Sequence, residues 1–316
     1  MASGQVAVAI IGSGEVGRGW ASLCVAAGWP VALFDYHSEA LEIAPAEIAG
    51  RARALVSLGR AAEASVEAGI ASLHVGRSLL QACGEAQWII EAISEDLLAK
   101  QKLFEAFESV APKARTITSS SSGFTVNDLV ARCRRPDRVL IAHPMAPVEL
   151  ITLVELVPGP GTDAALFEVL KGWLRALGRI PVTIRKPMQG NVAGRIAAAV
   201  WREAIDLVLQ GVIDVDDLDR VVSVGPALGW AAAGPHLSQY LAAGNRTLST
   251  FLQLQLQAQE PYWASLAAWS KLEPEDETRF IHAIAKAYEG EIDSIRRARN
   301  RRLAAILRAL EEARTG

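Results

Sequence analysis

The sequence predicts an α/β protein with an N-terminal domain built on a doubly wound sheet, residues 1–188, and an all-helical C-terminal domain, residues 189–316. Two observations support this. Short apolar strands alternate with helical segments through the first half of the chain, which is typical of a mostly parallel sheet covered by helices. After the stretch RKPMQGN the alternation stops, and segments of helical periodicity account for the rest.

Seven short apolar segments of the first domain are predicted to be strands. They are Val6–Ile11, Val31–Phe34, Trp88–Ile90, Thr116–Thr118, Val139–Ala142, Ile151–Val157 and Ile180–Ile184. Segments with helical periodicity lie between them, as in Leu97–Ala111 and Thr162–Leu177. Strands that alternate with helices in this way predict a mostly parallel sheet.

The second domain is predicted to consist of helices only, with the domain boundary near Pro187–Gly190. The four predicted helices are Val192–Gln210, Val215–Val224, Pro235–Gln259 and Pro274–Ala313. This part of the chain is rich in tryptophan, with Trp201, Trp230, Trp263 and Trp269. Since obligate dimer contacts resemble a domain core cut in half, some of this apolar surface is expected to contact a second copy of the chain.

Composition excludes several classes of function. Apolar residues make up 51% of the chain and charged residues 21%, which is ordinary for a folded protein, and the net charge of −3 gives no sign of a nucleic-acid partner. The three cysteines, Cys24, Cys83 and Cys133, show neither disulfide nor metal-site spacing, so no metal is expected. Without a signal peptide or an apolar run of about 18 residues, we expect no membrane association and a cytoplasmic location.

A glycine-rich loop follows the first predicted strand, in VAVAIIGSGEVGRGW. Gly12, Gly14 and Gly17 form the G-x-G-x-x-G pattern of dinucleotide binding, with Ser13, Glu15 and Val16 between them. Gly12 allows a tight turn, Gly14 lets the backbone approach a pyrophosphate, and Gly17 lets the helix approach the strand. Without a ligand, the same pattern would be only a glycine turn.

An acidic residue ends the second predicted strand, as dinucleotide binding requires. Asp35 follows Gly12 by 23 residues, where a carboxylate accepts hydrogen bonds from the adenine ribose and repels a 2′-phosphate. No arginine follows it, since the next residues are Tyr36 and His37. The sequence therefore predicts NAD rather than NADP as the cofactor.

A histidine ends the predicted strand in VLIAHPMAP. Taken alone, His143 is better explained as a polar residue that ends a buried strand. Glu155, in LVELVPG, lies 12 residues later on the next predicted strand and could point at the imidazole, where a carboxylate would fix the tautomer. Ser122, in TSSSSGF, adds a hydroxyl after a neighbouring strand. This combination is typical of general acid/base chemistry.

The chain resembles the 3-hydroxyacyl-CoA dehydrogenase family, and most closely its branch with lambda-crystallin, an L-gulonate 3-dehydrogenase, and L-carnitine dehydrogenase. The resemblance covers nearly the whole chain and rests on ordered motifs, which are IGSGEVGRGWA, EAISEDLLAK, SSSSGF, AHPMAP, LVELVPG and GWAAAGP. It implies a Rossmann domain, an all-helical dimerising domain, and oxidation of a hydroxyl β to a carboxyl or thioester.

The resemblance also implies roles for individual residues. His143 resembles the general acid/base, Glu155 its orienting partner, and Ser122 the hydroxyl that binds the reacting oxygen. Glu95 and Lys100 resemble residues that contact the nicotinamide half of the cofactor. From the residues alone, these last two would be a helix-start carboxylate and a surface lysine.

Three positions depart from the family pattern. Ala146 and Gly194 stand where asparagines are usual, and Gly229 replaces the arginine that the gulonate and carnitine branch carries before an aromatic residue. That arginine suits a substrate carboxylate. Asn191, one helical turn from Gly194, could supply the missing amide.

These departures predict a small-molecule substrate that is less anionic and bulkier than gulonate or carnitine. The small residues would widen the pocket, while Trp230 and Trp201 could form an aromatic wall. We expect a dehydrogenase or reductase for a β-hydroxy or β-keto compound. The alternatives are a biosynthetic ketoreductase or imine reductase, and a crystallin-like nucleotide-binding protein without turnover.

Overall fold

The computed structural model describes residues 5–159, 161–244 and 247–315, and divides the chain into two compact units, Met1–Arg195 and Ile196–Gly316. The division falls within α8 (Asn191–Leu209), whereas the predicted boundary after residue 188 lies in the loop before this helix. None of the helices in the described residues is long and apolar enough to cross a membrane.

The first unit contains an eight-stranded sheet in the order β3-β2-β1-β4-β5-β6-β7-β8. The strands are β1 (Val8–Ile11), β2 (Val31–Phe34), β3 (His74–Val75), β4 (Trp88–Glu91), β5 (Thr116–Ser119), β6 (Val139–Pro144), β7 (Leu153–Pro158) and β8 (Ile180–Thr183). Strand order reverses between β1 and β4, which is where such sheets bind ligands. The predicted doubly wound sheet is confirmed.

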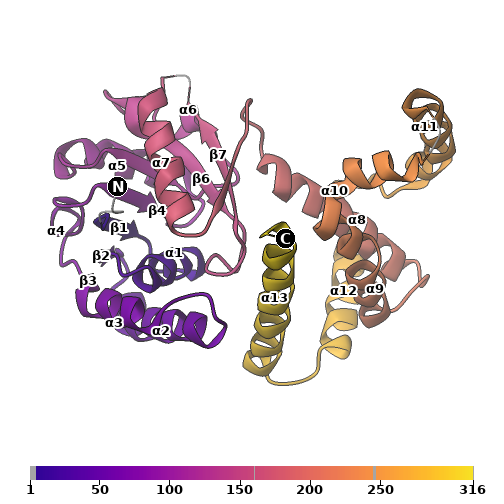
Figure 1. Ribbon diagram of the computed structural model, residues 1–316, viewed down its shortest axis with the longest axis horizontal. Helices are drawn as coiled ribbons and strands as arrows, with labels where there is room; N and C mark the ends of the chain where they lie inside the picture. The colour runs from indigo at the N-terminus through magenta and orange to yellow at the C-terminus, as the bar shows by residue number, and fades with distance from the viewer. Residues whose placement is uncertain (1–4, 160, 245–246, 316) are drawn as a thin grey trace. The chain divides into compact units, whose positions relative to one another are not determined.

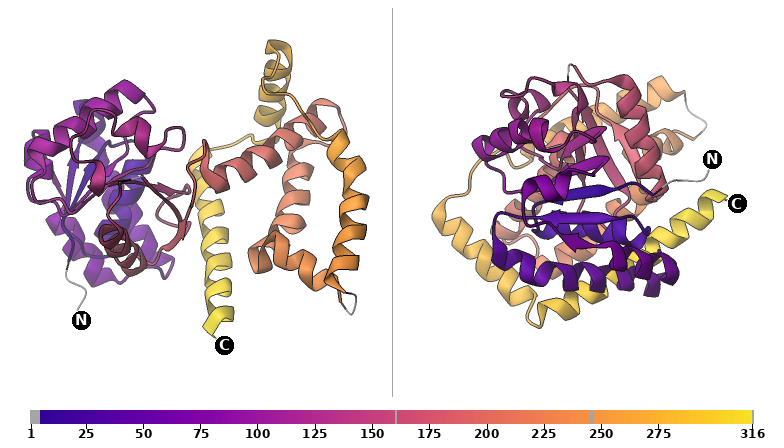
Figure 2. Two further views of the ribbon diagram at one scale, coloured as in Figure 1. Left: turned by 90° about the horizontal axis from the view of Figure 1, so that it is seen from above. Right: turned by 90° about the vertical axis from the view of Figure 1, so that its left-hand side faces the viewer.

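Helices cover both faces of this sheet (Figures 1 and 2). They are α1 (Glu15–Ala26), α2 (Ser38–Ser57), α3 (Glu63–Ser72), α4 (Leu79–Cys83), α5 (Leu97–Val110), α6 (Val126–Leu129) and α7 (Ala164–Ala176), with a short 3-10 helix at Pro136–Arg138. Each central strand is buried along its whole length because helices lie above and below it.

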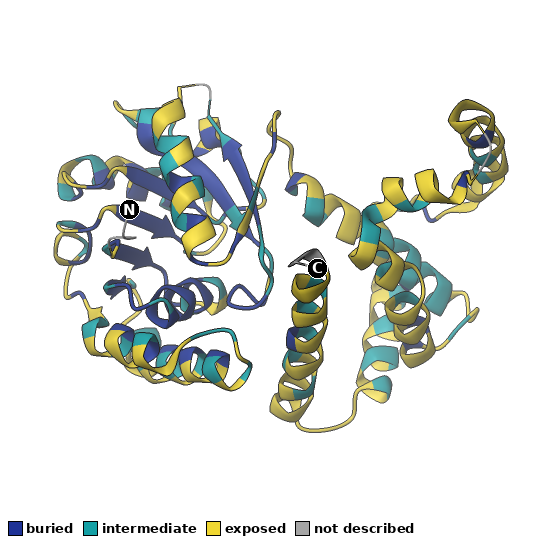
Figure 3. Ribbon diagram, in the orientation of Figure 1, coloured by how far each residue is buried: buried dark blue, intermediate teal, exposed yellow. Residues whose placement is uncertain are grey.

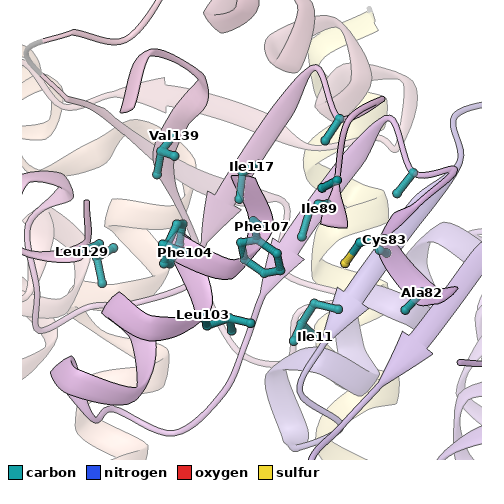
Figure 4. Close-up of a cluster of buried hydrophobic side chains, with 14 of the residues drawn as sticks. Ile11, Ala82, Cys83, Ile89, Leu103, Phe104, Phe107, Ile117, Leu129 and Val139 are labelled. Carbon is teal, nitrogen blue, oxygen red and sulfur yellow. The ribbon is translucent and has the colours of Figure 1, made fainter. Parts of the chain in front are cut away.

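Alternate strand residues build two apolar layers. Ile89 and Ile117 point to the face that carries α5, where they meet Phe104 and Phe107 (Figure 4). Trp88, on the other face, contacts Trp20 of α1 edge-on and the ring of Trp173 of α7, with ring centroids 5.7 and 6.0 Å away. The carboxyl ends of the central strands are thereby fixed from both sides.

The pair β6–β7 is antiparallel in an otherwise parallel sheet. The connection between the two strands is too short for a crossover helix, so the chain turns back beside β6. This reversal places His143 directly opposite Glu155 in the ladder.

The second unit contains the rest of α8 and five further helices in its described residues, α9 (Val215–Val224), α10 (Pro226–Ala242), α11 (Leu248–Ser265), α12 (Pro274–Ala287) and α13 (Ile292–Thr315). Two of the predicted helix boundaries are wrong. The predicted helix Pro235–Gln259 is divided between α10 and α11, and it spans residues 245–246, which lie outside the described residues. The predicted helix Pro274–Ala313 is α12 and α13.

Glycines explain both breaks. Gly244 (φ +57°) follows α10, and Gly290 (φ +140°) lies between α12 and α13, in conformations that are outside the right-handed helix. Gly234 also breaks α10 internally, with φ 74° and ψ 162°. The apolar periodicity continues on both sides of Gly244 and Gly290. For this reason the pattern alone predicts one long helix where the structure has two.

Candidate active site

The glycine-rich loop connects β1 to α1 at the point where strand order reverses. Gly12 has φ +109°, and a Cβ atom there would lie 2.4 Å from the carbonyl oxygen of Ala92. A Cβ on Gly17 would lie 1.9 Å from the Gly12 carbonyl oxygen, whereas one on Gly14 would meet no atom within 4 Å. The first and third glycines are therefore required by packing, while Gly14 leaves open space at the start of α1 for a ligand.

Asp35 is bound to this loop. Its Oδ2 accepts hydrogen bonds from the backbone N–H (2.6 Å) and the hydroxyl (2.8 Å) of Ser13, and its Oδ1 accepts one from the His37 N–H (2.9 Å). Burial alone would raise the pKa of Asp35, but these hydrogen bonds outweigh it and hold that pKa below its ordinary value. The residue is thus an anion held beside the glycine loop.

A cavity of about 940 Å³ opens over the loop. Its walls come from the glycine loop, from the segment after β2 with the start of α2, and from the loop between β4 and α5 with the first turns of α5, and they are mostly apolar. The lining includes Gly12, Ser13, Gly14, Glu15, Val16, Asp35, Tyr36, Ile93 and Leu103. The size, the open face of Gly14 and the carboxylate of Asp35 fit a dinucleotide with free ribose hydroxyls.

Arg51 of α2, which the sequence analysis missed, holds the first turn of α1. Its guanidinium donates two hydrogen bonds to Glu15, at 2.9 and 2.6 Å, and lies 3.8 Å from Glu149 in the loop that follows His143. Hydrogen bonding to Glu15 is the main cause that raises the pKa of Arg51. This pair fixes the cofactor loop against α2. This contact is difficult to predict from the sequence, because Glu15 and Arg51 are 36 residues apart in the chain.

His143 and Glu155 form a hydrogen-bonded pair between β6 and β7. The His143 Nδ1 lies 2.9 Å from Glu155 Oε2, and the side chains are only 12% and 2% exposed. An ionised carboxylate can only accept, so Nδ1 carries the proton and Nε2 is left as the acceptor. An imidazole held in this tautomer can take a proton from a bound hydroxyl.

Glu155 also caps α8. Its second oxygen, Oε1, accepts hydrogen bonds from the backbone N–H groups of Val192 and Ala193, both at 2.9 Å. The free N–H groups and the positive end of the helix dipole favour a carboxylate at this position. One buried side chain therefore fixes both the histidine tautomer and the start of α8.

Ser122 lies in the loop after β5, whose carboxyl end is beside that of β6. The Ser122 side chain is exposed, its backbone carbonyl accepts a hydrogen bond from Gly190 N–H at 2.8 Å, and its hydroxyl bonds to nothing within the described part of the chain. Glu95 and Lys100 lie nearby in the chain fold: Lys100 is buried and its Nζ lies 3.2 Å from a Glu95 oxygen. Lys100 Nζ also lies 2.6 Å from an oxygen of the buried Glu91, and a Glu95 oxygen accepts a hydrogen bond from the Gly123 N–H at 2.8 Å.

Asn191 and Gly194 occupy the first turn of α8. Asn191 is 3% exposed, has φ 49°, and its amide nitrogen is buried without a hydrogen-bond partner among the described residues. A Cβ on Gly194 would meet nothing within 4 Å. Trp230 lies on α10 in the second unit and is 42% exposed. Substrate contacts by these three residues remain predictions.

A sequence model described as "3-hydroxyacyl-CoA dehydrogenase, NAD binding domain" matches residues 7–187, which contain the cofactor loop and the His143–Glu155 pair. The chain belongs to the 3-hydroxyacyl-CoA dehydrogenase family. This confirms the predicted family, NAD as its cofactor, and an oxidoreductase that acts on a CH–OH group.

Known dehydrogenases are similar to the chain over most of its length. L-carnitine dehydrogenase of Nocardiopsis dassonvillei is 30% identical, over 96% of this chain and 92% of that protein. The enzyme of the same name from Burkholderia mallei is 33% identical, over 82% and 80% of the two chains. Among solved structures, the NAD⁺-dependent dismutase 5-formyl-3-hydroxy-2-methylpyridine 4-carboxylic acid 5-dehydrogenase is 25% identical, with a TM-score of 0.81 over 97% of this chain and 99% of that one.

From the position of the Asp35 carboxylate we predict that the protein prefers NAD to NADP. Replacing Asp35 with alanine should weaken NADH binding about 10- to 100-fold, since hydrogen bonds to charged groups contribute about 1.5–3 kcal/mol. The same variant should discriminate less against NADPH, because the repelling charge is gone. Fluorescence titration with both cofactors measures this, with Glu42→Ala on the exposed side of α2 as control. An unchanged preference would remove Asp35 from cofactor selection.

Proposed function

We propose that the protein interconverts a β-hydroxy compound other than a CoA thioester and its keto form, with His143 and Glu155 as the acid/base pair. The observation that carries this proposal is the 2.9 Å bond between the two side chains, on strands whose ends lie at the ligand-binding edge of the sheet. The dinucleotide cavity opens at the same edge, over Gly12 and Ala92 at the ends of β1 and β4.

The side chains act as follows in the oxidative direction. His143 Nε2 takes the proton of the substrate hydroxyl, and Glu155 stabilises the imidazolium that results. The Ser122 hydroxyl donates a hydrogen bond to the reacting oxygen. NAD, when bound, supplies the ring carbon that accepts the hydride. In reduction, the imidazolium returns the proton to the carbonyl oxygen.

The substrate that we propose is less anionic and bulkier than L-carnitine or L-gulonate. Gly194 and Gly229 lack the amide and the guanidinium that the family pattern places there, and a Cβ built on either meets nothing within 4 Å. Asn191 is a candidate replacement donor, because its buried side-chain amide nitrogen has no hydrogen-bond partner among the described residues. The similar solved dehydrogenase is named for a substituted pyridine, which supports a ring-bearing substrate.

A kinetic panel tests this proposal. NADH absorbance is followed with hydroxy acids, cyclic β-keto compounds, other ketones and imines, in both directions. We expect a ring-bearing β-hydroxy or β-keto compound to exceed L-carnitine, L-gulonate and a short 3-hydroxyacyl-CoA by at least about 10-fold in kcat/KM, equivalent to about 1.4 kcal/mol. A clear preference for imines would favour an imine reductase, and NADH binding without any turnover would favour a structural protein.

Gly194→Asn provides a matched variant for the panel. Because a Cβ atom at position 194 meets nothing within 4 Å, the variant should keep the melting temperature of the wild type within about 2 °C. It should shift the preference toward the acyclic hydroxy acids, since it restores a family amide and fills the space. Should L-carnitine or the hydroxyacyl-CoA already be by far the best substrate of the wild type, the proposed substrate class is wrong.

We also propose a homodimer formed through the second unit, in a reducing, cytoplasmic compartment. In the single chain, α10 and α12 bury no residue, so their ribbons carry only the colours of exposed and half-buried residues (Figure 3). Large side chains such as Tyr240, Tyr262 and Trp263 are more than half exposed. An interface would remove this apolar surface from water. Light scattering should give twice the 33.8 kDa mass of one chain.

The proposed compartment is supported by the cysteines. Cys24, Cys83 and Cys133 are all free thiols, as is usual for proteins of a reducing, cytoplasmic compartment.

A further inference from the structure

Asn191 begins α8 between the segments that hold the proposed catalytic residues. Gly190, which precedes it, donates its backbone N–H to the Ser122 carbonyl at 2.8 Å. The residue that follows it donates its N–H to Glu155 Oε1 at 2.9 Å, and the other oxygen of Glu155 lies 2.9 Å from His143 Nδ1. All of these residues belong to the first unit. Asn191 is therefore held between Ser122 and the His143–Glu155 pair.

The amide nitrogen of Asn191 is buried without a hydrogen-bond partner among the described residues, and the residue as a whole is 3% exposed. Leaving a buried donor unpaired destabilises a fold, so native proteins pair nearly all such groups. The exceptions are expected at functional sites, where a ligand completes the pairing. Because this donor lies beside the proposed catalytic residues, we expect its missing partner to be a group of the substrate.

Neither helix capping nor backbone conformation explains an asparagine at this position. An asparagine at a helix start usually accepts N–H groups of the first turn with its side-chain oxygen. In α8 the N–H groups of Val192 and Ala193 already bond to Glu155. The φ of 49° at Asn191 is a left-handed conformation that asparagine tolerates, but glycine adopts it without strain. The side chain therefore has another role.

The charges near Asn191 favour an uncharged ligand group. The amide donates a hydrogen bond but carries no charge. The Glu155 carboxylate, which is 2% exposed, is bonded to the next residue of the chain and would repel a second carboxylate beside it. The cation of this helix turn, Arg195, is exposed to solvent, and Gly229 lacks the arginine that the family pattern provides for a substrate carboxylate. A neutral acceptor, such as the carbonyl of an amide or ester, needs no cation.

We propose that the Asn191 amide binds an uncharged hydrogen-bond acceptor of the substrate, next to the carbon that carries the reacting hydroxyl. The inference rests on the function proposed above and narrows its substrate class. The preferred compound is a β-hydroxy amide, ester or cyclic ketone rather than a β-hydroxy acid. Ser122 contacts the reacting oxygen and Asn191 contacts the second acceptor, so the two donors orient the carbon that loses the hydride.

Three matched substrates test this inference with the full-length protein: a cyclic β-hydroxy amide, the corresponding β-hydroxy acid and the parent cyclic alcohol. NADH formation is followed with the wild type and with Asn191→Gly, which removes the amide and suits the φ of 49°. The wild type should prefer the amide to the other two by at least about 10-fold in kcat/KM. Asn191→Gly should lower kcat/KM for the amide about 10- to 100-fold, the effect of losing the partner of one buried group. For the alcohol, which has no second acceptor, the change should be less than about 3-fold.

Thermal unfolding separates substrate binding from a structural role. Asn191→Gly removes a buried donor that has no partner among the described residues and places glycine at a left-handed position. Its melting temperature should therefore stay within about 3 °C of the wild type or rise. The Kd for NADH should stay within about 2-fold, because the amide bonds to the substrate in this account. A larger fall in melting temperature would show that the amide stabilises the fold, and the inference would be wrong.

Gln189→Ala is the matched control, because Gln189 carries an exposed amide in the loop just before Asn191. It should leave kcat/KM for all three substrates unchanged. If the wild type prefers the acid, or if Asn191→Gly affects the three substrates equally, the inference is wrong while the proposed function stands. If no compound of this series or of the kinetic panel is turned over, the proposed function fails and the inference fails with it.

Discussion

Replacing His143 with alanine is expected to lower kcat by about 10²- to 10⁴-fold, the usual contribution of a positioned general acid/base. The imidazole is the group that moves the proton in our account, and no other titratable side chain is hydrogen-bonded to Glu155 among the described residues. The Kd for NADH should change less than about 2-fold, because His143 does not line the cavity over the glycine loop.

Steady-state kinetics and NADH fluorescence titration measure these two quantities separately. His74→Ala is a suitable control, since His74 is an exposed histidine at the sheet edge, on β3. The variant at position 74 should retain full turnover. Full turnover by the His143 variant would remove this residue from the mechanism.

Replacing Glu155 with glutamine is expected to lower kcat by a similar factor of about 10²- to 10⁴-fold and also to destabilise the fold. Glutamine has one acceptor and one donor where Glu155 has two acceptors. If its NH₂ faces His143, the imidazole must change tautomer. If its NH₂ faces α8, it meets the N–H groups of Val192 and Ala193, and the helix start loses its acceptor.

The stability loss should be about 1–3 kcal/mol, the cost of leaving buried donors without a partner. Urea unfolding measures it, with Glu168→Gln on α7 as the control, because the Glu168 side chain is 65% exposed and pairs with Lys171 on the same helix. A Glu155→Gln variant with wild-type kcat and wild-type stability would show that neither oxygen has the role that we assign.

Local patterns explain what the sequence could predict. The first strand, the glycine loop and Asp35 follow one another within a single βαβ unit, so their spacing fixes their relation in space. The contact between Glu155 and His143 could be anticipated because the two residues lie on consecutive strands. In both cases short connections leave the chain few alternatives.

Features that depend on side chains from several elements were not predictable in this way. Glu91 ends an apolar strand like any polar boundary residue, and only the folded chain brings Lys100 and Ser119 to it. The second role of Glu155, as the cap of α8, likewise needs the position of a helix 37 residues later. Helix ends at Gly244 and Gly290 were missed because apolar periodicity resumes after each glycine.

A crystal structure of the protein with NADH bound would test the central claim most directly. Our account predicts that the nicotinamide ring lies at the carboxyl edge of the sheet with its reactive carbon facing His143 Nε2, and that Glu155 remains on Nδ1. A ring bound far from His143, or a Glu155 side chain turned away from the imidazole, would contradict it.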